Sequence, residues 1–354
     1  MPIPFIVAGL AAATAAYGGK KAYDGYQTKS EAKDLLESVK SNHEAAVTQF
    51  EAVNEITAGK LENLGQLQLE IGQDFTLFGE ISKDLLQKLN QNERKALEMN
   101  NVPQHKLNKI KKFSISATEY LGTVVGAGAT GAAAGFAVYG SVMTLAAEST
   151  GTSISALSGV AAYNATMAAI GGGSLATGGL GMAGGAAILG VAVAAPVLAV
   201  VGWAYNSHAE KSLDTAKKAR TQTEDIVKKL KLAELQRTTM QGYIDSIHHT
   251  LSDIHASFTP YLTTLIEINQ RLLNDEPIDH YSDEIMHSVG NGYAIAAIMT
   301  DLITTPLFKL KKDENGEPIL ENDAPQFAID ENDMQIFNQD ELGVAIATAR
   351  HQHR

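Results

Sequence analysis

The residues best suited to chemistry are three histidines in a long predicted helix. His248 and His255 lie seven residues apart, so both fall on one helix face, where two imidazoles could help to bind a metal ion. No carboxylate at a suitable spacing completes a metal site, so surface positions are the simpler interpretation for these histidines and for His249. A further interpretation is pH sensing, because protonated imidazoles would add charge to the seam of a helix bundle.

A glycine-rich stretch invites comparison with phosphate-binding loops. It comprises Gly171–Ser174 and the pair Gly178-Gly179. No Gly-Lys-Ser or Gly-Lys-Thr follows, however, and neither a strand-then-helix pattern nor an acidic ribose ligand is apparent. The chain also lacks a Ser/His/Asp arrangement or a carboxylate pair that stands out from chance. The sequence therefore predicts no catalytic residue, no metal, no cofactor and no enzyme activity.

The composition describes a folded chain whose charge is strongly acidic. Its 354 residues are 45% hydrophobic and 19% charged, which allows a sizeable core and excludes a disordered chain. The net charge of -12 argues against a nucleic-acid partner, because nucleic-acid binding normally uses a basic stripe. Any attraction to anionic lipid must therefore come from local lysine clusters. The absence of cysteine excludes disulfides and thiolate chemistry.

The chain is organised around one apolar segment, residues 113–206. Between Tyr120 and Asn206 the only formally charged side chain is that of Glu148. Most of the other residues in this stretch are Ala, Gly, Val, Ile, Leu, Ser and Thr. Such a segment is either the buried centre of a helical protein or a segment that enters lipid.

Glycines four residues apart within this segment predict close packing between helices. Small residues at this spacing make a flat strip on a helix, and such strips are a main source of helix association in lipid. Pro196 interrupts the last apolar run, and the aromatic residues that end the run resemble an interfacial anchor. The residues assigned to membrane insertion and helix packing are Gly122, Gly126, Gly131, Gly135, Gly173, Gly181, Gly185, Pro196, Trp203 and Tyr205.

Lysines flank the apolar segment on both sides. Cationic residues at both ends favour the same side of a membrane for the two ends, and hence two or four crossings. The crossings would lie in the arms Tyr120–Ala147 and Ile154–Tyr205. The competing interpretation makes these arms the permanent core of a soluble helical head, because Ala and Gly partition weakly into lipid. The basic flanks are Lys109, Lys111, Lys112 and Lys211.

Two long helical rods are expected on either side of the segment, at residues 29–112 and 207–276. In the second rod, ten apolar positions from Met240 to Leu272 follow alternating spacings of four and three, as in a coiled-coil seam. Two rods of similar length, joined through an apolar insert, most simply lie antiparallel. The insert would then project from one end of the rod.

Glycines interrupt the first rod. Gly65, Gly72 and Gly79 recur every seven residues, so they fall on one face and predict the close approach of a neighbouring helix. Each of them lowers helix propensity by roughly 1 kcal/mol relative to Ala. A break near Gly59 would divide the rod into two shorter helices.

The ends of the chain are expected to be smaller elements. Residues 1–28 form an apolar N-terminal helix with no clear signal peptide, because the lysine pair follows the apolar run instead of preceding it. Residues 277–305 contain a short helix, about Asp283 to Thr304. In residues 306–354 a hairpin and a tail follow. The hairpin joins Leu307–Lys311 and Pro318–Leu320 through the turn dipeptide Asn315-Gly316, a helix covers Gln339–Ala349, and His351 and His353 are unordered.

The predicted fold is therefore all-α. It is a long antiparallel helical rod or coiled-coil bundle with an apolar Ala/Gly-rich head inserted between the two main helices. A small C-terminal β-hairpin completes it.

Four runs of residues carry a resemblance to known proteins. They are Ala16–Tyr26, Ser153–Gly159, Asn164–Thr166 and Gly171–Gly179. These runs are similar to an element of bacterial helical proteins of unassigned function that have glycine-zipper centres. In layout, the chain also resembles the α-helical pore-forming toxins of the cytolysin A type, in which long tail helices carry an apolar head. The long insert, the C-terminal hairpin and the missing secretion signal depart from that pattern, and no toxin residue can be transferred.

Two functions follow as expectations. The first is a membrane-active, pore-forming or membrane-perturbing protein, soluble in the cytoplasm or after release, that inserts its apolar arms into a lipid bilayer. It would form a homo-oligomer there, with co-encoded protein partners as a further option. The second is a soluble coiled-coil scaffold that binds a protein partner and keeps the apolar segment as its core.

Overall fold

The structure is a computed structural model in which two compact units are distinguished. It describes residues 19–89, 102–122, 133–138, 140, 209–316, 318–321, 324–331 and 334–354. The first unit contains the described residues of Met1–Val53 and Val191–Leu235, and the second contains those of Asn54–Gly190 and Gln236–Arg354. Residues 1–18 of the predicted N-terminal helix lie outside the described residues, and so does most of the apolar segment.

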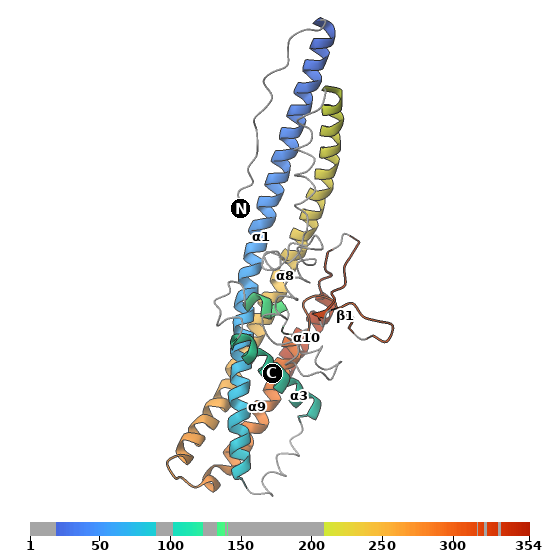
Figure 1. Ribbon diagram of the computed structural model, residues 1–354. Helices are drawn as coiled ribbons and strands as arrows, with labels where there is room; N and C mark the ends of the chain where they lie inside the picture. The colour runs from blue at the N-terminus through green and yellow to red at the C-terminus, as the bar shows by residue number, and fades with distance from the viewer. Residues whose placement is uncertain are drawn as a thin grey trace. The chain divides into compact units, whose positions relative to one another are not determined.

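Two long helices contribute to both units. Helix α1 extends over Gly19–Lys88 and helix α8 over Ala209–Leu272 (Figure 1). The first rod therefore ends well before residue 112. Helix α1 continues through Gly59, where a break was an option, and α8 continues through Pro260. A Cβ atom at Gly59 would meet no other atom within 4 Å, so nothing packs closely there.

In the second unit, α1 and α8 run parallel to each other. The side chains of Thr57 and Gln241 are hydrogen-bonded at 2.9 Å, and the Lys60 ammonium lies 2.6 Å from the Asp245 carboxylate. Further along both helices, Nε2 of His255 lies 2.8 Å from a carboxylate oxygen of Asp74. The residue numbers rise together along both helices, as only a parallel pair allows.

The expectation of antiparallel rods is thus wrong. A seam of apolar residues at spacings of four and three can be buried in either direction, so it does not specify the direction. The expectation assumed that the apolar insert joins the rods at one end. Parallel helices cannot be joined in that way, because the end of one helix and the start of the other lie a helix length apart.

The first unit has the same helix direction. The Gln49 amide donates to the Glu234 carboxylate at 2.7 Å. The buried side chains of Ile226 and Leu230 pack against Phe50 and its neighbours on α1. Within this unit, too, α1 and α8 run in the same direction (Figure 1).

The core of the second unit confirms the predicted seam of α8. Its positions from Met240 to Leu272 are buried or half-buried in one cluster. On α1, Phe75 and Phe78 pack against Phe258 with ring centroids 5.5 and 5.1 Å apart. Aromatic pairs of this geometry contribute about 0.5–1.5 kcal/mol beyond the area that they bury.

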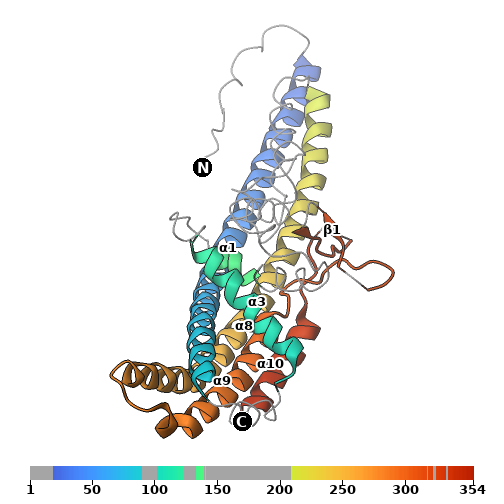
Figure 2. The same ribbon diagram turned by 60° about the horizontal axis from the view of Figure 1, so that its bottom comes forward.

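Three further helices cover this core, α3 (Gln104–Tyr120), α9 (Ser282–Ile303) and α10 (Gln339–His353). Helix α9 packs against both α3 and α10 (Figure 2). It follows a short 3-10 helix, η5 (Ile278–Tyr281), and lies within one residue of its predicted bounds at each end.

Helix α10 begins at the predicted residue and continues beyond Ala349. It is anchored on α8 by two polar contacts. Nε of Arg350 donates to the Thr250 hydroxyl at 2.9 Å, and Nε2 of His353 lies 2.8 Å from the Ser257 hydroxyl. His353 is therefore an ordered part of the second unit, contrary to the expectation of an unordered end.

The predicted hairpin after Leu307 is not supported. The turn is present, since Gly316 has a φ of 85° and donates its N–H to the Asp313 carbonyl at 3.1 Å. The extended residues before it do not pair with one strand, however. The N–H of Lys309 donates to Ile336, and its carbonyl accepts from Ala328. The paired strands of the structure are the two-residue β1 (Leu320–Glu321) and β2 (Ala324–Pro325), which are antiparallel.

Candidate functional site at the base of the apolar segment

Two of the glycines assigned to membrane packing fall within the described residues. Gly122 is exposed, and among the described residues no atom lies within 4 Å of the place that a Cβ atom would take there. Gly135 is buried within the helical segment 133–138. The remaining assigned positions lie outside the described residues, namely Gly126, Gly131, Gly173, Gly181, Gly185, Pro196, Trp203 and Tyr205.

The beginning of the apolar segment lies against glycines of α1. A Cβ atom at Gly65 would overlap the backbone carbonyl of Ala133, and one at Gly72 would overlap the Cβ of Ala117. Both glycines thus permit a contact that any side chain would prevent. Gly79 has only ordinary contact distance to the Tyr293 hydroxyl. The predicted close approach at heptad spacing is therefore confirmed at two of the three glycines.

Polar contacts hold the same residues in place. The backbone N–H of Ala134 donates to a carboxylate oxygen of Glu62 at 2.9 Å. Hydroxyls of Thr76 and Thr118 lie 3.1 Å apart. We call the α1 surface formed by Glu62, Gly65, Gly72, Phe75 and Thr76 the glycine cradle.

An aromatic chain connects the glycine cradle to the apolar segment. The ring of Phe75 lies 6.1 Å from that of Phe113, which lies 6.0 Å from Phe136. Tyr120 and Phe136 have ring centroids 5.1 Å apart. The Phe136 side chain is only 1% exposed, so this part of the apolar segment belongs to the hydrophobic core of the second unit.

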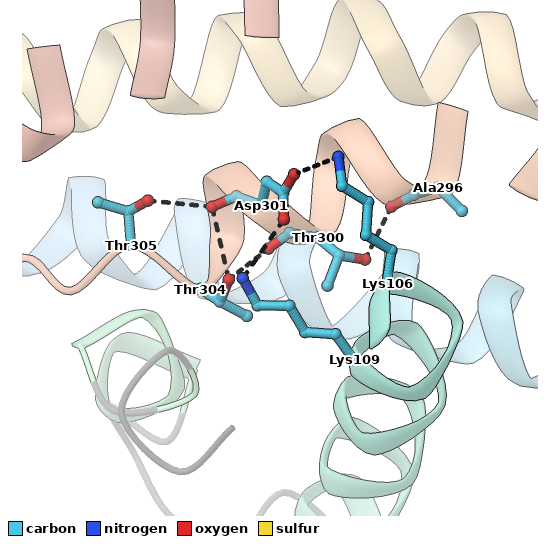
Figure 3. A network of polar contacts seen from close by, with 7 residues as sticks. All are labelled: Lys106, Lys109, Ala296, Thr300, Asp301, Thr304 and Thr305. Carbon is cyan, nitrogen blue, oxygen red and sulfur yellow. Dashed lines mark hydrogen bonds and ion pairs between the residues drawn. The ribbon is translucent and has the colours of Figure 1, made fainter. Parts of the chain in front are cut away.

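Two lysines of α3 share one carboxylate of α9. The ammonium groups of Lys106 and Lys109 lie 3.1 and 3.3 Å from different oxygens of Asp301 (Figure 3). Of the predicted basic flanks, Lys109 is thus ion-paired, Lys111 is exposed and Lys112 is half-buried. Lys211 falls within α8, but its side chain lies outside the described residues.

Threonines near the end of α9 form hydrogen bonds to backbone carbonyls of their own helix and take no part in the ion pair. The hydroxyls of Thr300 and Thr304 donate to backbone carbonyls one turn earlier, at 2.7 Å each. The Thr305 hydroxyl donates to the backbone carbonyl of Asp301 at 3.0 Å (Figure 3). The Asp301 carboxylate therefore faces the lysines with both of its oxygens.

The histidines of α8 occupy different environments. His249 is exposed, whereas the His255 side chain is only 12% exposed and stacks on the ring of Phe258. The surface interpretation is therefore wrong for His255. Its partner Asp74 lies far away in the sequence, so spacing along α8 could not reveal the pair. Among the described residues, no group of acidic and histidine side chains is arranged to hold a metal ion.

One buried charge was missed by the sequence analysis. The side chain of Arg237 is 2% exposed, and no described residue forms a hydrogen bond with its Nε or Nη1 atom. Burial lowers the pKa of Arg237 to about 9. A signal was present, because Arg237 precedes Met240 by three residues and thus continues the apolar seam toward the start of α8.

Comparison with known proteins adds no relative. No protein-family model matches the chain, and neither a curated protein nor a solved structure does. Within the part of the chain that the structure describes, no helix combines the length and the apolar character that a membrane crossing requires. The two predicted membrane arms lie mostly outside that part.

Proposed function

We propose that this chain is a membrane-active protein that keeps an apolar Ala/Gly-rich segment docked on a helical bundle and delivers it to a lipid bilayer, where copies of the chain associate. The observation that carries the proposal is the packing of residues 133–138 and Tyr120 on the glycine cradle. Lipid is proposed as the environment that the segment enters, because the stretch from Tyr120 to Asn206 has almost no charge.

Docking through glycines suits a segment that must later leave. Gly65 contacts the backbone of Ala133 and Gly72 contacts the Cβ of Ala117, so neither contact itself buries a large side chain. The Glu62 carboxylate contributes one charge-assisted hydrogen bond, and such bonds contribute about 1.5–3 kcal/mol. The aromatic residues Phe113, Tyr120 and Phe136 add buried apolar area, which a lipid bilayer would also shield from water.

The test mixes detergent-free protein with lipid vesicles and measures flotation and dye release in the same samples. Flotation together with dye release is the expected result. Leucine substitution at Gly126, Gly131, Gly181 and Gly185 is expected to abolish assembly on vesicles while far-UV circular dichroism stays unchanged. The matched control is Gly59→Leu, because that position is free of close contacts. Assembly that survives the four substitutions would count against the glycine faces, and a stable protein that neither floats nor releases dye would overturn the proposal.

A second function, a scaffold that binds a protein partner, is favoured by one observation. Phe136 and its neighbours are as deeply buried as the central residues of α8, as expected if the segment stays in the core permanently. Limited proteolysis separates the two functions. A scaffold keeps its cleavage pattern when vesicles are added, whereas a docked segment that enters lipid changes it.

A further inference from the structure

Helix α3 is basic, although the chain as a whole is acidic. It carries Lys106, Lys109, Lys111 and Lys112, and its only acidic residue is Glu119 in the last turn, whereas the whole chain has a net charge of -12. These lysines stand directly before the apolar segment, whose first residues form the rest of the helix. Its outer face also presents Ile115, an apolar side chain that is 39% exposed. Of the four lysines, Lys111 is exposed like Ile115, whereas Lys106, Lys109 and Lys112 are half-buried. An exposed cation near an exposed apolar side chain is typical of a helix that contacts a lipid surface.

The contact between α3 and α9 leaves positive charge unneutralised. Within the part of the chain that the structure describes, Lys106 and Lys109 share the carboxylate of Asp301, so two ammonium groups face one carboxylate. The side chain of Asp301 is 42% exposed, and those of the lysines are 28% and 18% exposed. Partly exposed ion pairs of this kind contribute little to stability and are weakened by salt. An anion with more charge than one carboxylate can therefore compete for both lysines.

We propose that α3 is a sensor for anionic lipid, in which phosphate headgroups displace Asp301 from Lys106 and Lys109 and so loosen α3 from α9. The inference rests on the proposed function, and it names both the lipid class and the event that releases the segment. Helix α3 carries Phe113 and Ala117, which face the glycine cradle. Movement of α3 away from α9 thus disturbs the surface that holds the apolar segment.

The size of the attraction is sufficient for this role. A lysine near an anionic membrane surface strengthens partitioning by about fivefold, and Lys106, Lys109 and Lys111 supply three such groups. The attraction therefore exceeds what the single Asp301 carboxylate contributes in a partly exposed position. Lipid phosphate is the chosen ligand because the neighbouring residues are apolar and begin the segment that is expected to enter the bilayer.

The experiment compares flotation with two kinds of vesicle at low salt, phosphatidylcholine alone and an equal mixture of phosphatidylcholine and phosphatidylglycerol. The unsubstituted protein is expected to partition at least tenfold more strongly to the anionic vesicles, and salt should reduce the difference. The double variant Lys106→Gln, Lys109→Gln is expected to lose about tenfold of this partitioning. Asp301→Asn should increase it, because both lysines become available. The control is Lys60→Gln, which removes an ion pair between α1 and α8 without altering α3.

Hydrogen exchange of α3 provides a second measurement that does not depend on insertion. Anionic vesicles are expected to speed exchange in Phe113 and its neighbours, whereas the same concentration of inorganic phosphate should have a much smaller effect. An effect of Lys60→Gln equal to that of the double variant would overturn the proposal. Equal partitioning to both vesicles, unchanged by Asp301→Asn, would overturn the sensor and leave the proposed function standing. Absence of binding to either vesicle would overturn the proposed function itself.

Discussion

The imidazole of His255 lies 2.8 Å from the carboxylate of Asp74, a residue 181 positions earlier in the chain. The pair joins the parallel helices α1 and α8 in the second unit, and its histidine ring stacks on Phe258 at a centroid distance of 6.4 Å. Both side chains are largely shielded from water. The pair therefore fixes the register of the two helices at the level of the aromatic core.

A double-mutant cycle on His255→Leu and Asp74→Leu should measure this coupling. We expect a coupling free energy of about 1–2 kcal/mol, because a shielded hydrogen bond to a charged group contributes more than an exposed one. The measurement is chemical unfolding of the four proteins. The comparison pair is His249–Asp253 on the exposed side of α8, for which we expect less than about 0.5 kcal/mol. Equal couplings for the two pairs would contradict the structural role of His255.

The parallel direction of α1 and α8 can be tested by crosslinking, because the chain contains no cysteine. Cysteines at Thr57 and Gln241 should be joined efficiently by a short thiol-to-thiol crosslinker, since the native side chains are in hydrogen-bond contact. Cysteines at Lys88 and Gln241 should not be joined. Lys88 lies 31 residues after Thr57 on the same helix, which corresponds to about 46 Å. The reverse outcome would restore the antiparallel arrangement.

The glycine cradle makes a prediction about stability. Gly65→Ala should lower the free energy of unfolding by about 1–3 kcal/mol, because the new methyl group overlaps the Ala133 carbonyl and forces residues 133–138 to move. Gly59→Ala should raise the free energy of unfolding by up to about 1 kcal/mol, because alanine favours the helix and meets no atom there. Chemical unfolding followed by circular dichroism measures both changes. A similar stabilisation by both substitutions would mean that nothing occupies the cradle in solution.

The sequence predicts the local features of this fold well and the long-range ones poorly. The position of α9 and the buried seam of α8 could be predicted from the periodicity of apolar residues, because this pattern depends on residues one or two turns apart. Gly65 and Gly72 showed that a neighbour would approach closely, but not that it would be the segment containing Ala133. The neighbour depends on contacts between distant parts of the chain, which spacing within one helix does not encode.

Polar contacts between distant parts of the chain were not predictable from the sequence either. Asp301 forms ion pairs with two lysines of α3. Nothing in the spacing of residues along α9 distinguishes it from other exposed acidic residues. The extended residues around Lys309 carry the pattern of one hairpin strand. Next to the turn, the Lys311 carbonyl accepts from the N–H of Ile319, as the predicted hairpin requires. The remaining hydrogen bonds go to two other segments, because Ala328 and Ile336 both bond to Lys309. The turn dipeptide was thus sufficient to predict the bend at Gly316 and the contact beside it, but not the pairing of the rest of the strand.

Arg237 provides the last prediction, which concerns pH. Its guanidinium is buried with two nitrogen atoms unpartnered, and burial lowers the pKa of Arg237 to about 9 in the folded protein, below its ordinary value in the unfolded chain. Below pH 9 the group is charged in both states, so the folded state bears the full penalty of burying the charge. Above pH 9 the folded state releases the proton before the unfolded state does, and the penalty declines as the pH rises.

Arg237→Met should therefore stabilise the protein by about 1–4 kcal/mol at pH 7, because an apolar side chain of similar length replaces an unpartnered buried charge. The gain should remain constant from pH 7 to about pH 8.5 and shrink between pH 9 and 10.5. Chemical unfolding of the variant and the unsubstituted protein at each pH gives this difference, in which the titration of all other groups cancels. Arg220→Met is the matched control, because Arg220 is exposed and pairs only with Glu224 one turn away on the same helix. A stabilisation that does not change with pH, or a loss of stability at pH 7, would mean that the Arg237 guanidinium has a partner in solution that neutralises its charge.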